Sequence, residues 1–216
     1  MLDVGCGPGA LTTELVRRLG DAAVTAVDPS EPFVAAARER HPGVQVERVS
    51  AEHLPFPDRE FDASLAQLVV HFMTDAVAGL REMARVTRKD GVVAACVWDH
   101  AGGQGPLSTY WEAAHELDRD VEDESALARA REGHLGELFD AAGLHEIEER
   151  QLAVSVEHSS FEDWWEPFRL GVGPAGAYAA GLDPERQTEL RERCREKLPA
   201  APFVLTARAW AARGRA

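Results

Sequence analysis

Residues 2–10 read Leu-Asp-Val-Gly-Cys-Gly-Pro-Gly-Ala, a pattern in which a short strand ends, glycines turn the chain and a helix begins. Glycines let the backbone approach a ligand closely, and the first turn of a helix offers free N–H groups. Gly5, Gly7 and Ala10 also satisfy the loose dinucleotide fingerprint G-x-G-x-x-G/A. The stretch alone therefore predicts a nucleotide-binding α/β fold and leaves the ligand open.

Two carboxylates beside this stretch narrow the choice of ligand. Asp3 lies inside the first strand, where a carboxylate would repel a pyrophosphate but attract an α-ammonium group. Asp28 ends the second strand, where a carboxylate can accept hydrogen bonds from two ribose hydroxyls. A third segment, Ser-Ala-Glu-His-Leu-Pro-Phe-Pro-Asp at 50–58, follows the third strand. Together these features favour a ligand that carries both an amino acid and a ribose.

Apolar runs and helical stripes alternate through the first hundred residues. Alternation at this spacing predicts βαβ units and a parallel sheet. The strands are predicted at 2–4, 22–27, 44–49, 61–70 and 92–98, and the helices at 11–19, 30–40 and from 77 to about 89–91.

The second half of the chain has a different pattern. Two late strands separated only by loops and a helix predict an antiparallel addition to the parallel sheet. A Gly/Ala-rich segment at 171–181 indicates a mobile loop. The strands are predicted around 152–156 and 203–210, and the helices at 125–142, with a break at Gly133, and from Asp183-Pro184 to about 198.

Composition limits the classes of function. The chain has 216 residues, 45% of them hydrophobic, which is enough for a sizeable core, and its net charge is −14. Such an acidic chain is a poor candidate for binding nucleic acid or an anionic membrane. Cys6, Cys96 and Cys194 are too few and too scattered for a disulfide framework or a zinc site, so we expect no metal and a cytoplasmic protein.

Four segments of the chain stand out by their order and spacing: LDVGCGPG at 2–9, VDPS at 27–30, AEHLPFPDREFD at 51–62 and REMARVTRKDG at 81–91. Together they resemble the class I S-adenosylmethionine-dependent methyltransferases, especially the ubiquinone and menaquinone biosynthesis group. The resemblance is clear over residues 1–98 and weak over 99–216. It implies a Rossmann-like, mostly parallel seven-stranded sheet with helices on both faces and an antiparallel C-terminal strand.

The resemblance also implies a cofactor, S-adenosylmethionine, with S-adenosylhomocysteine as its product, and it assigns roles to single residues. Asp3, Gly5 and Gly7 would line the methionine half of the cofactor. The family often has Asp where this chain has Ser50, so either Glu52 reads the exocyclic amine in its place or adenine recognition is weaker. The other roles are Asp28 at the ribose, Pro29 beside the adenine, the Ala51 N–H and Glu52 at the adenine edge, and Gln67 near the sulfonium.

The same resemblance implies a single methyltransferase domain, with 1–98 as the cofactor-binding half and 99–216 as the substrate side. The acceptor would be a small molecule. His71, after the fourth strand, is the first candidate for a general base, and Asp99 and His100 follow. Aromatic residues in the second half are candidates for core or for an acceptor pocket: Trp98, Trp111, Trp164, Trp165 and Phe168.

Two other functions remain open from the sequence. A nicotinamide-dependent oxidoreductase is disfavoured by Asp3 and by the 50–58 segment. A non-catalytic cofactor-binding protein is the stronger rival, because only four residues precede Gly5. Related enzymes carry helical residues upstream, so we expect the chain to lack an N-terminal cover and to have a weakly anchored first strand.

Overall fold

The computed structural model describes residues 1–123, 131–169, 171 and 173–216. Its residues group into two compact units. Unit 1 comprises Met1–Val97, Glu132–Gln151 and Trp210–Ala216, and unit 2 comprises Trp98–Arg131 and Leu152–Ala209. The predicted functional halves, 1–98 and 99–216, stay a prediction.

Within the described residues, seven strands form one sheet in the order β3-β2-β1-β4-β5-β7-β6. The strands from β1 to β5 pair in parallel. The Asp90 N–H donates to the Ala216 carbonyl and the Asp99 N–H to the Arg208 carbonyl, so β7 runs antiparallel to β5. The strands are β1 (Leu2–Val4), β2 (Thr25–Asp28), β3 (Gln45–Arg48), β4 (Phe61–Gln67), β5 (Thr87–Trp98), β6 (His145–His158) and β7 (Phe203–Arg215).

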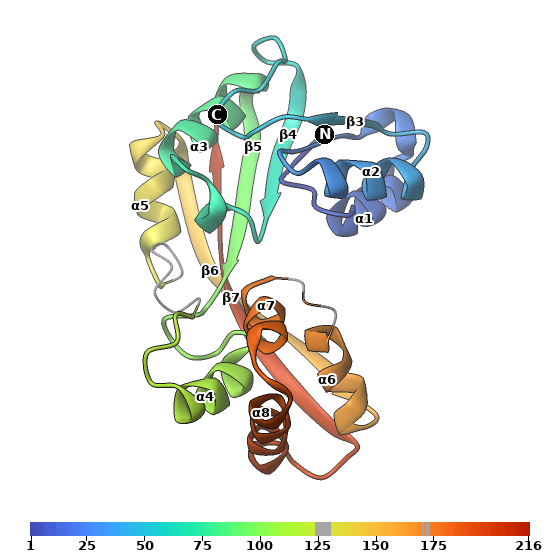
Figure 1. Cartoon of the computed structure of the whole chain (residues 1–216). Helices are drawn as coiled ribbons and strands as arrows, with labels where there is room; N and C mark the ends of the chain where they lie inside the picture. Colours follow the sequence, from blue (N-terminus) through green and yellow to red (C-terminus); the bar gives the residue numbers. More distant parts are fainter. Residues whose placement is uncertain (124–130, 170, 172) are drawn as a thin grey trace. The chain divides into compact units, whose positions relative to one another are not determined.

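Helices cover both faces of the sheet in unit 1 (Figure 1). Leu2 and Val4 of β1 pack in a core with α3 (Ala76–Val86) and α5 (His134–Ala141). Side chains alternate between the faces of a strand, so Asp3 points to the opposite face. That face is covered by α1 (Ala10–Leu19) and α2 (Glu31–Arg40). These observations confirm the predicted fold class.

Unit 2 is built around aromatic side chains on helices. The rings of Tyr110 and Phe168 stack with centroids 4.5 Å apart, and the Tyr110 hydroxyl donates to the Ala175 carbonyl (2.7 Å). These contacts join α4, α6 and α7 into one core. The helices of this unit are α4 (Ser108–Leu117), α6 (Phe161–Arg169), α7 (Gly173–Gly181) and α8 (Pro184–Lys197).

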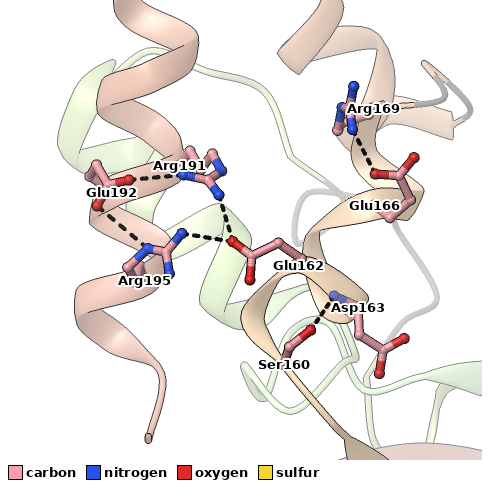
Figure 2. A network of polar contacts seen from close by, with 8 residues as sticks. All are labelled: Ser160, Glu162, Asp163, Glu166, Arg169, Arg191, Glu192 and Arg195. Carbon is pink, nitrogen blue, oxygen red and sulfur yellow. Dashed lines mark hydrogen bonds and ion pairs between the residues drawn. The ribbon is translucent and has the colours of Figure 1, made fainter. Parts of the chain in front are cut away.

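A polar network holds α6 against α8 on the outside of this core (Figure 2). Glu162 accepts from Arg191 (2.7 Å) and from Arg195 (3.0 Å). Both guanidinium groups lie over the Phe161 ring, at 5.2 and 4.1 Å from its centroid. Because the carboxylate is largely exposed, we assign this network an orienting role rather than a large share of the stability.

Several predicted elements are corrected by the structure. Residues 173–181 form the helix α7 rather than a loop. Alanine is the best helix former, and Ala175 and Ala179 bury their side chains, while a Cβ on Gly176 would lie only 2.9 Å from the backbone of Gly171. The glycines there permit close packing of the helix.

The helix α3 ends earlier than predicted, at Val86, and β5 begins at once with Thr87. The Thr87 hydroxyl donates to the Met83 carbonyl (2.7 Å) and lies 2.8 Å from the Ser64 hydroxyl, so it joins the helix end to β4. The strand predicted at 61–70 ends at Gln67. The helix α5 begins at His134, directly after Gly133, and residues 125–130 of the predicted helix lie outside the described residues.

Candidate functional site

The glycine loop is held in left-handed conformations at Gly5 (φ 70°), Gly7 (φ 54°) and Gly9 (φ 91°). The N–H groups of Gly5 and Cys6 both donate to the Val27 carbonyl (2.8 and 3.0 Å), which fixes the loop to the end of β2. A Cβ on Gly5 would lie 2.3 Å from Cγ2 of Val69. Glycine is therefore required here by both conformation and space.

Asp28 ties this loop to the start of α2. One carboxylate oxygen accepts from the Gly7 N–H (2.9 Å) and the other from the Ser30 N–H (2.8 Å). The side chain is buried. Each carboxylate oxygen has a second lone pair, so Asp28 can still accept from another donor while it holds the loop.

Asp3 is the most deeply buried carboxylate of the predicted set, at 1% exposure. Its Oδ2 accepts from the Thr12 hydroxyl (2.6 Å), while Oδ1 is buried without a hydrogen-bond partner among the described residues. Burial raises the pKa of Asp3 to about 6; the Thr12 hydrogen bond opposes this shift, and the charge of Asp28 adds to it. A buried carboxylate with an open acceptor atom is suited to a cationic ligand group.

The other residues predicted to contact the cofactor have more varied surroundings. Ala51 is buried, Glu52 is half-buried, and Pro29 and Gln67 are exposed. Glu52 Oε1 accepts from the N–H of Asp75, just before α3, at 3.3 Å. The structure thus joins Gly7 to Asp28 directly, and it joins Glu52 to the start of α3.

The candidate bases fall into different units. His71 lies in the short helix η2 (Val70–Phe72) after β4; it is buried, with its ring centroid 4.1 Å from that of Phe72. Asp99 and His100 belong to unit 2. Asp99 Oδ1 accepts from the Gly102 N–H (2.9 Å), and burial lowers the pKa of His100.

Three neighbours of the loop were missed by the sequence reasoning: Thr12, His41 and Val69. His41 is buried, and its Nε2 lies 2.9 Å from the Thr13 hydroxyl and 3.3 Å from the Gly9 carbonyl. The sequence carried a signal for Thr12, since this residue is polar and lies in the first turn of the helix that follows the loop. No local pattern marks His41 or Val69, because both reach the loop from distant elements.

Cys6, inside the loop, is a packing residue. Its side chain is buried, and burial raises the pKa of the thiol to about 12. A thiol with such a pKa is not a nucleophile at neutral pH.

The aromatic residues predicted as core or pocket serve as both. Trp111, Trp164, Trp165 and Phe168 are buried in the core of unit 2. Trp164 and Phe168 also line a pocket in this unit, together with Trp98.

The described residues hold neither a metal-binding cluster nor a membrane-spanning helix. They contain no cluster of three or more His, Cys, Asp or Glu side chains arranged to hold a metal ion. None of the helices in residues 1–123, 131–169 and 173–216 has the length and apolar character needed to span a membrane.

Comparisons with known proteins find similarity to methyltransferases, mainly in the first half of the chain. Residues 2–95 match the family described as "Methyltransferase domain". A malonyl-[acyl-carrier protein] O-methyltransferase of Geobacter sulfurreducens is 31% identical over 154 residues, which cover 65% of this chain and 57% of that protein. A demethylmenaquinone methyltransferase of Tropheryma whipplei is 37% identical over 102 residues, 46% of this chain and 42% of that protein.

A similar solved structure is the YcgJ protein of Bacillus subtilis. The two structures superpose with a TM-score of 0.62 at 19% identity, covering 99% of this chain and 90% of that one. At this identity the likeness concerns the fold. The chain spans 57% and 42% of the lengths of the two curated relatives above.

Proposed function

We propose that this chain, whose residues 2–95 match the family described as "Methyltransferase domain", is a class I S-adenosylmethionine-dependent methyltransferase that transfers a methyl group from this cofactor to a small-molecule acceptor. The match of residues 2–95 to a methyltransferase family supports both the family and the cofactor predicted from the sequence. The observation that carries the proposal is the pair of buried carboxylates, Asp3 and Asp28, beside one glycine loop.

The two carboxylates suit different parts of the cofactor. Asp3 has an acceptor oxygen without a partner among the described residues, and an α-ammonium group would supply the missing charge and donor. Asp28 already holds the Gly7 N–H and retains lone pairs for the ribose hydroxyls. The left-handed glycines allow the backbone to approach the methionine half between them.

The remaining cofactor contacts complete the proposed site. Pro29 would pack beside the adenine, and the Ala51 N–H and the Glu52 side chain would read its edge. Gln67, at the end of β4, would lie near the sulfonium. Gly5 and Gly7 would line the methionine half together with Asp3.

Methyl transfer requires little covalent chemistry from the protein. The sulfonium supplies an electrophilic methyl carbon, and S-adenosylhomocysteine is its leaving group. The chain's own contribution is to align the acceptor with that carbon, which is worth roughly 7–11 kcal/mol. Where the acceptor must lose a proton, we propose His71 as the base, because its imidazole follows β4 at the edge of the sheet where ligands bind in such folds.

The cofactor assignment is tested by calorimetry on the purified chain. We expect saturable binding of S-adenosylhomocysteine and no comparable binding of NADH. The transfer itself is tested with methyl-labelled cofactor and a panel of quinols, phenols and amines. Absence of binding at about 1 mM cofactor would contradict the proposal, since it sets the binding free energy above roughly −4 kcal/mol.

A non-catalytic cofactor-binding protein remains the second candidate, because a fold can keep its ligand site without the reaction. Binding without transfer to any acceptor class would favour it. The three cysteines are all free, which supports a reducing compartment such as the cytoplasm for either function.

Glu52 gives a specific prediction. We expect Glu52→Gln to weaken cofactor binding by about 5-fold, because a hydrogen bond from the adenine amine to a charged acceptor becomes a neutral one. Glu60→Gln is the matched control, since Glu60 is an exposed acid near the end of the same segment, 51–62. Calorimetry on the three proteins measures the effect, and an unchanged affinity for Glu52→Gln would assign Glu52 to the Asp75 contact alone.

A further inference from the structure

A pocket of about 490 Å³ lies in unit 2, and all of its lining residues belong to that unit. Its size falls within the range of pockets that bind drug-sized molecules. The pocket is therefore a candidate binding site formed by unit 2 alone, whereas the proposed cofactor residues belong to unit 1.

The pocket walls are largely apolar. Aromatic rings come from Trp98 at the end of β5, and from Trp164 and Phe168 of α6. Val154 and Val156 of β6 form another wall, although their side chains are 48% and 51% exposed. Exposing two neighbouring valines costs free energy, which a ligand covering them would recover.

The charged residues of the pocket indicate which kinds of ligand it can hold. Among the described residues its lining contains the carboxylate of Glu112 and the imidazole of His158, and no lysine or arginine. Lys197 lies 4.0 Å from Glu112 but is closer to Glu116, at 2.6 Å. His158 in turn faces Asp163 at 3.8 Å. The pocket therefore offers an anionic ligand no cationic partner of its own.

We propose that this pocket binds an uncharged, mainly apolar small molecule with an aromatic or aliphatic body. The aromatic walls and the two valines supply the contact area, and the Glu112 carboxylate disfavours anions. Hydroxyl groups of Ser108 and Thr109 at the lining can orient one polar end of such a ligand. The inference does not rest on methyl transfer.

Two fluorescent probes with the same skeleton test the proposal. N-phenyl-naphthylamine is neutral, and anilinonaphthalene sulfonate adds a sulfonate to it. We expect saturable binding of the neutral probe, with energy transfer from the tryptophans, and an affinity about 5-fold or more above that of the sulfonate. Glu112→Gln should reduce this preference. Lack of saturation, or equal affinities, would overturn the proposal.

A matched pair of variants locates the binding. Val154→Asp places a carboxylate on the pocket wall, and we expect it to lower the affinity for the neutral probe by about 10-fold. Val204→Asp is the control, because Val204 is a similarly exposed valine (57%) on β7 that does not line the pocket. Equal affinity in Val154→Asp and wild type would also overturn the proposal. Cofactor binding, measured in parallel, should be unchanged in both variants, so a failure here is distinct from a failure of the proposed function.

Discussion

Replacing Asp28 by alanine should weaken binding of S-adenosylhomocysteine by about 100-fold, because the ribose loses its charged acceptor and the glycine loop loses its anchor. In the structure Asp28 accepts from Gly7 and from Ser30, so the variant also leaves two backbone N–H groups without their acceptor. Calorimetry well below the melting temperature measures the affinity, and thermal unfolding measures the loss of stability.

Two further variants separate these contributions. Asp28→Asn keeps one acceptor oxygen at nearly the same size, so we expect an affinity between those of wild type and Asp28→Ala. Asp140→Ala removes the same charge from an exposed position on α5 and should leave binding unchanged. If Asp28→Ala bound the cofactor as tightly as wild type, the ribose would have to be held elsewhere.

Replacing Asp3 by asparagine should change stability and cofactor binding in opposite directions. The pKa of Asp3 is about 6 in the folded protein, against an ordinary value of 3.8 for an exposed aspartate. A carboxyl whose pKa is raised by folding costs stability once it ionises, so the wild type loses up to about 3 kcal/mol as the pH rises from about 4 to 8. Asparagine does not ionise and removes this loss.

The measurement compares the free energy of unfolding of two proteins at two pH values, and the result is the double difference between them. Denaturant unfolding of wild type and Asp3→Asn at about pH 4 and pH 8 should show the variant gaining roughly 3 kcal/mol relative to wild type at the higher pH. The titrations of all other groups cancel in the comparison. At the higher pH we expect cofactor binding to be at least about 10-fold weaker in the variant, since the ammonium loses its counter-charge.

The variant Thr12→Val provides a second test of how the pKa of Asp3 affects stability. The Thr12 hydroxyl donates to Asp3 and lowers its pKa, so the nearly isosteric valine should move the stability transition to higher pH. A double difference near zero for Asp3→Asn would mean that the carboxyl ionises in the folded protein with its ordinary pKa. Equal cofactor affinity would mean that Asp3 does not meet the ammonium.

The sequence predicted the first half of the fold well, because its signals are local. Buried parallel strands are short apolar runs, and the turn after β1 needs glycines whose φ values are positive. The same segments located Asp3 and Asp28. The residues that lie against the glycine loop were not predictable. Val69 comes close to Gly5, and His41 to Gly9, only after distant strands and helices have packed.

The second half was less predictable because packing overrides local composition there. Glycine and alanine at 173–181 indicated a loop, yet the small side chains let α7 pack closely against its neighbours.

In the first half of the chain, the pairing of Asp28 with Gly7 also lacked a local signal. Residues separated along the chain by a helix and a strand carry no periodicity that links them.

The position of β7 affects the order in which the sheet can assemble. In sequence it follows β6, but in the sheet it lies between β5 and β6. Until β7 is in place, β6 has no neighbouring strand in this sheet, so its backbone N–H and C=O groups have no strand to pair with. Contacts of such wide sequence separation form slowly. During synthesis, β6 is therefore left without a neighbouring strand until the last strand of the sheet, β7, has been made.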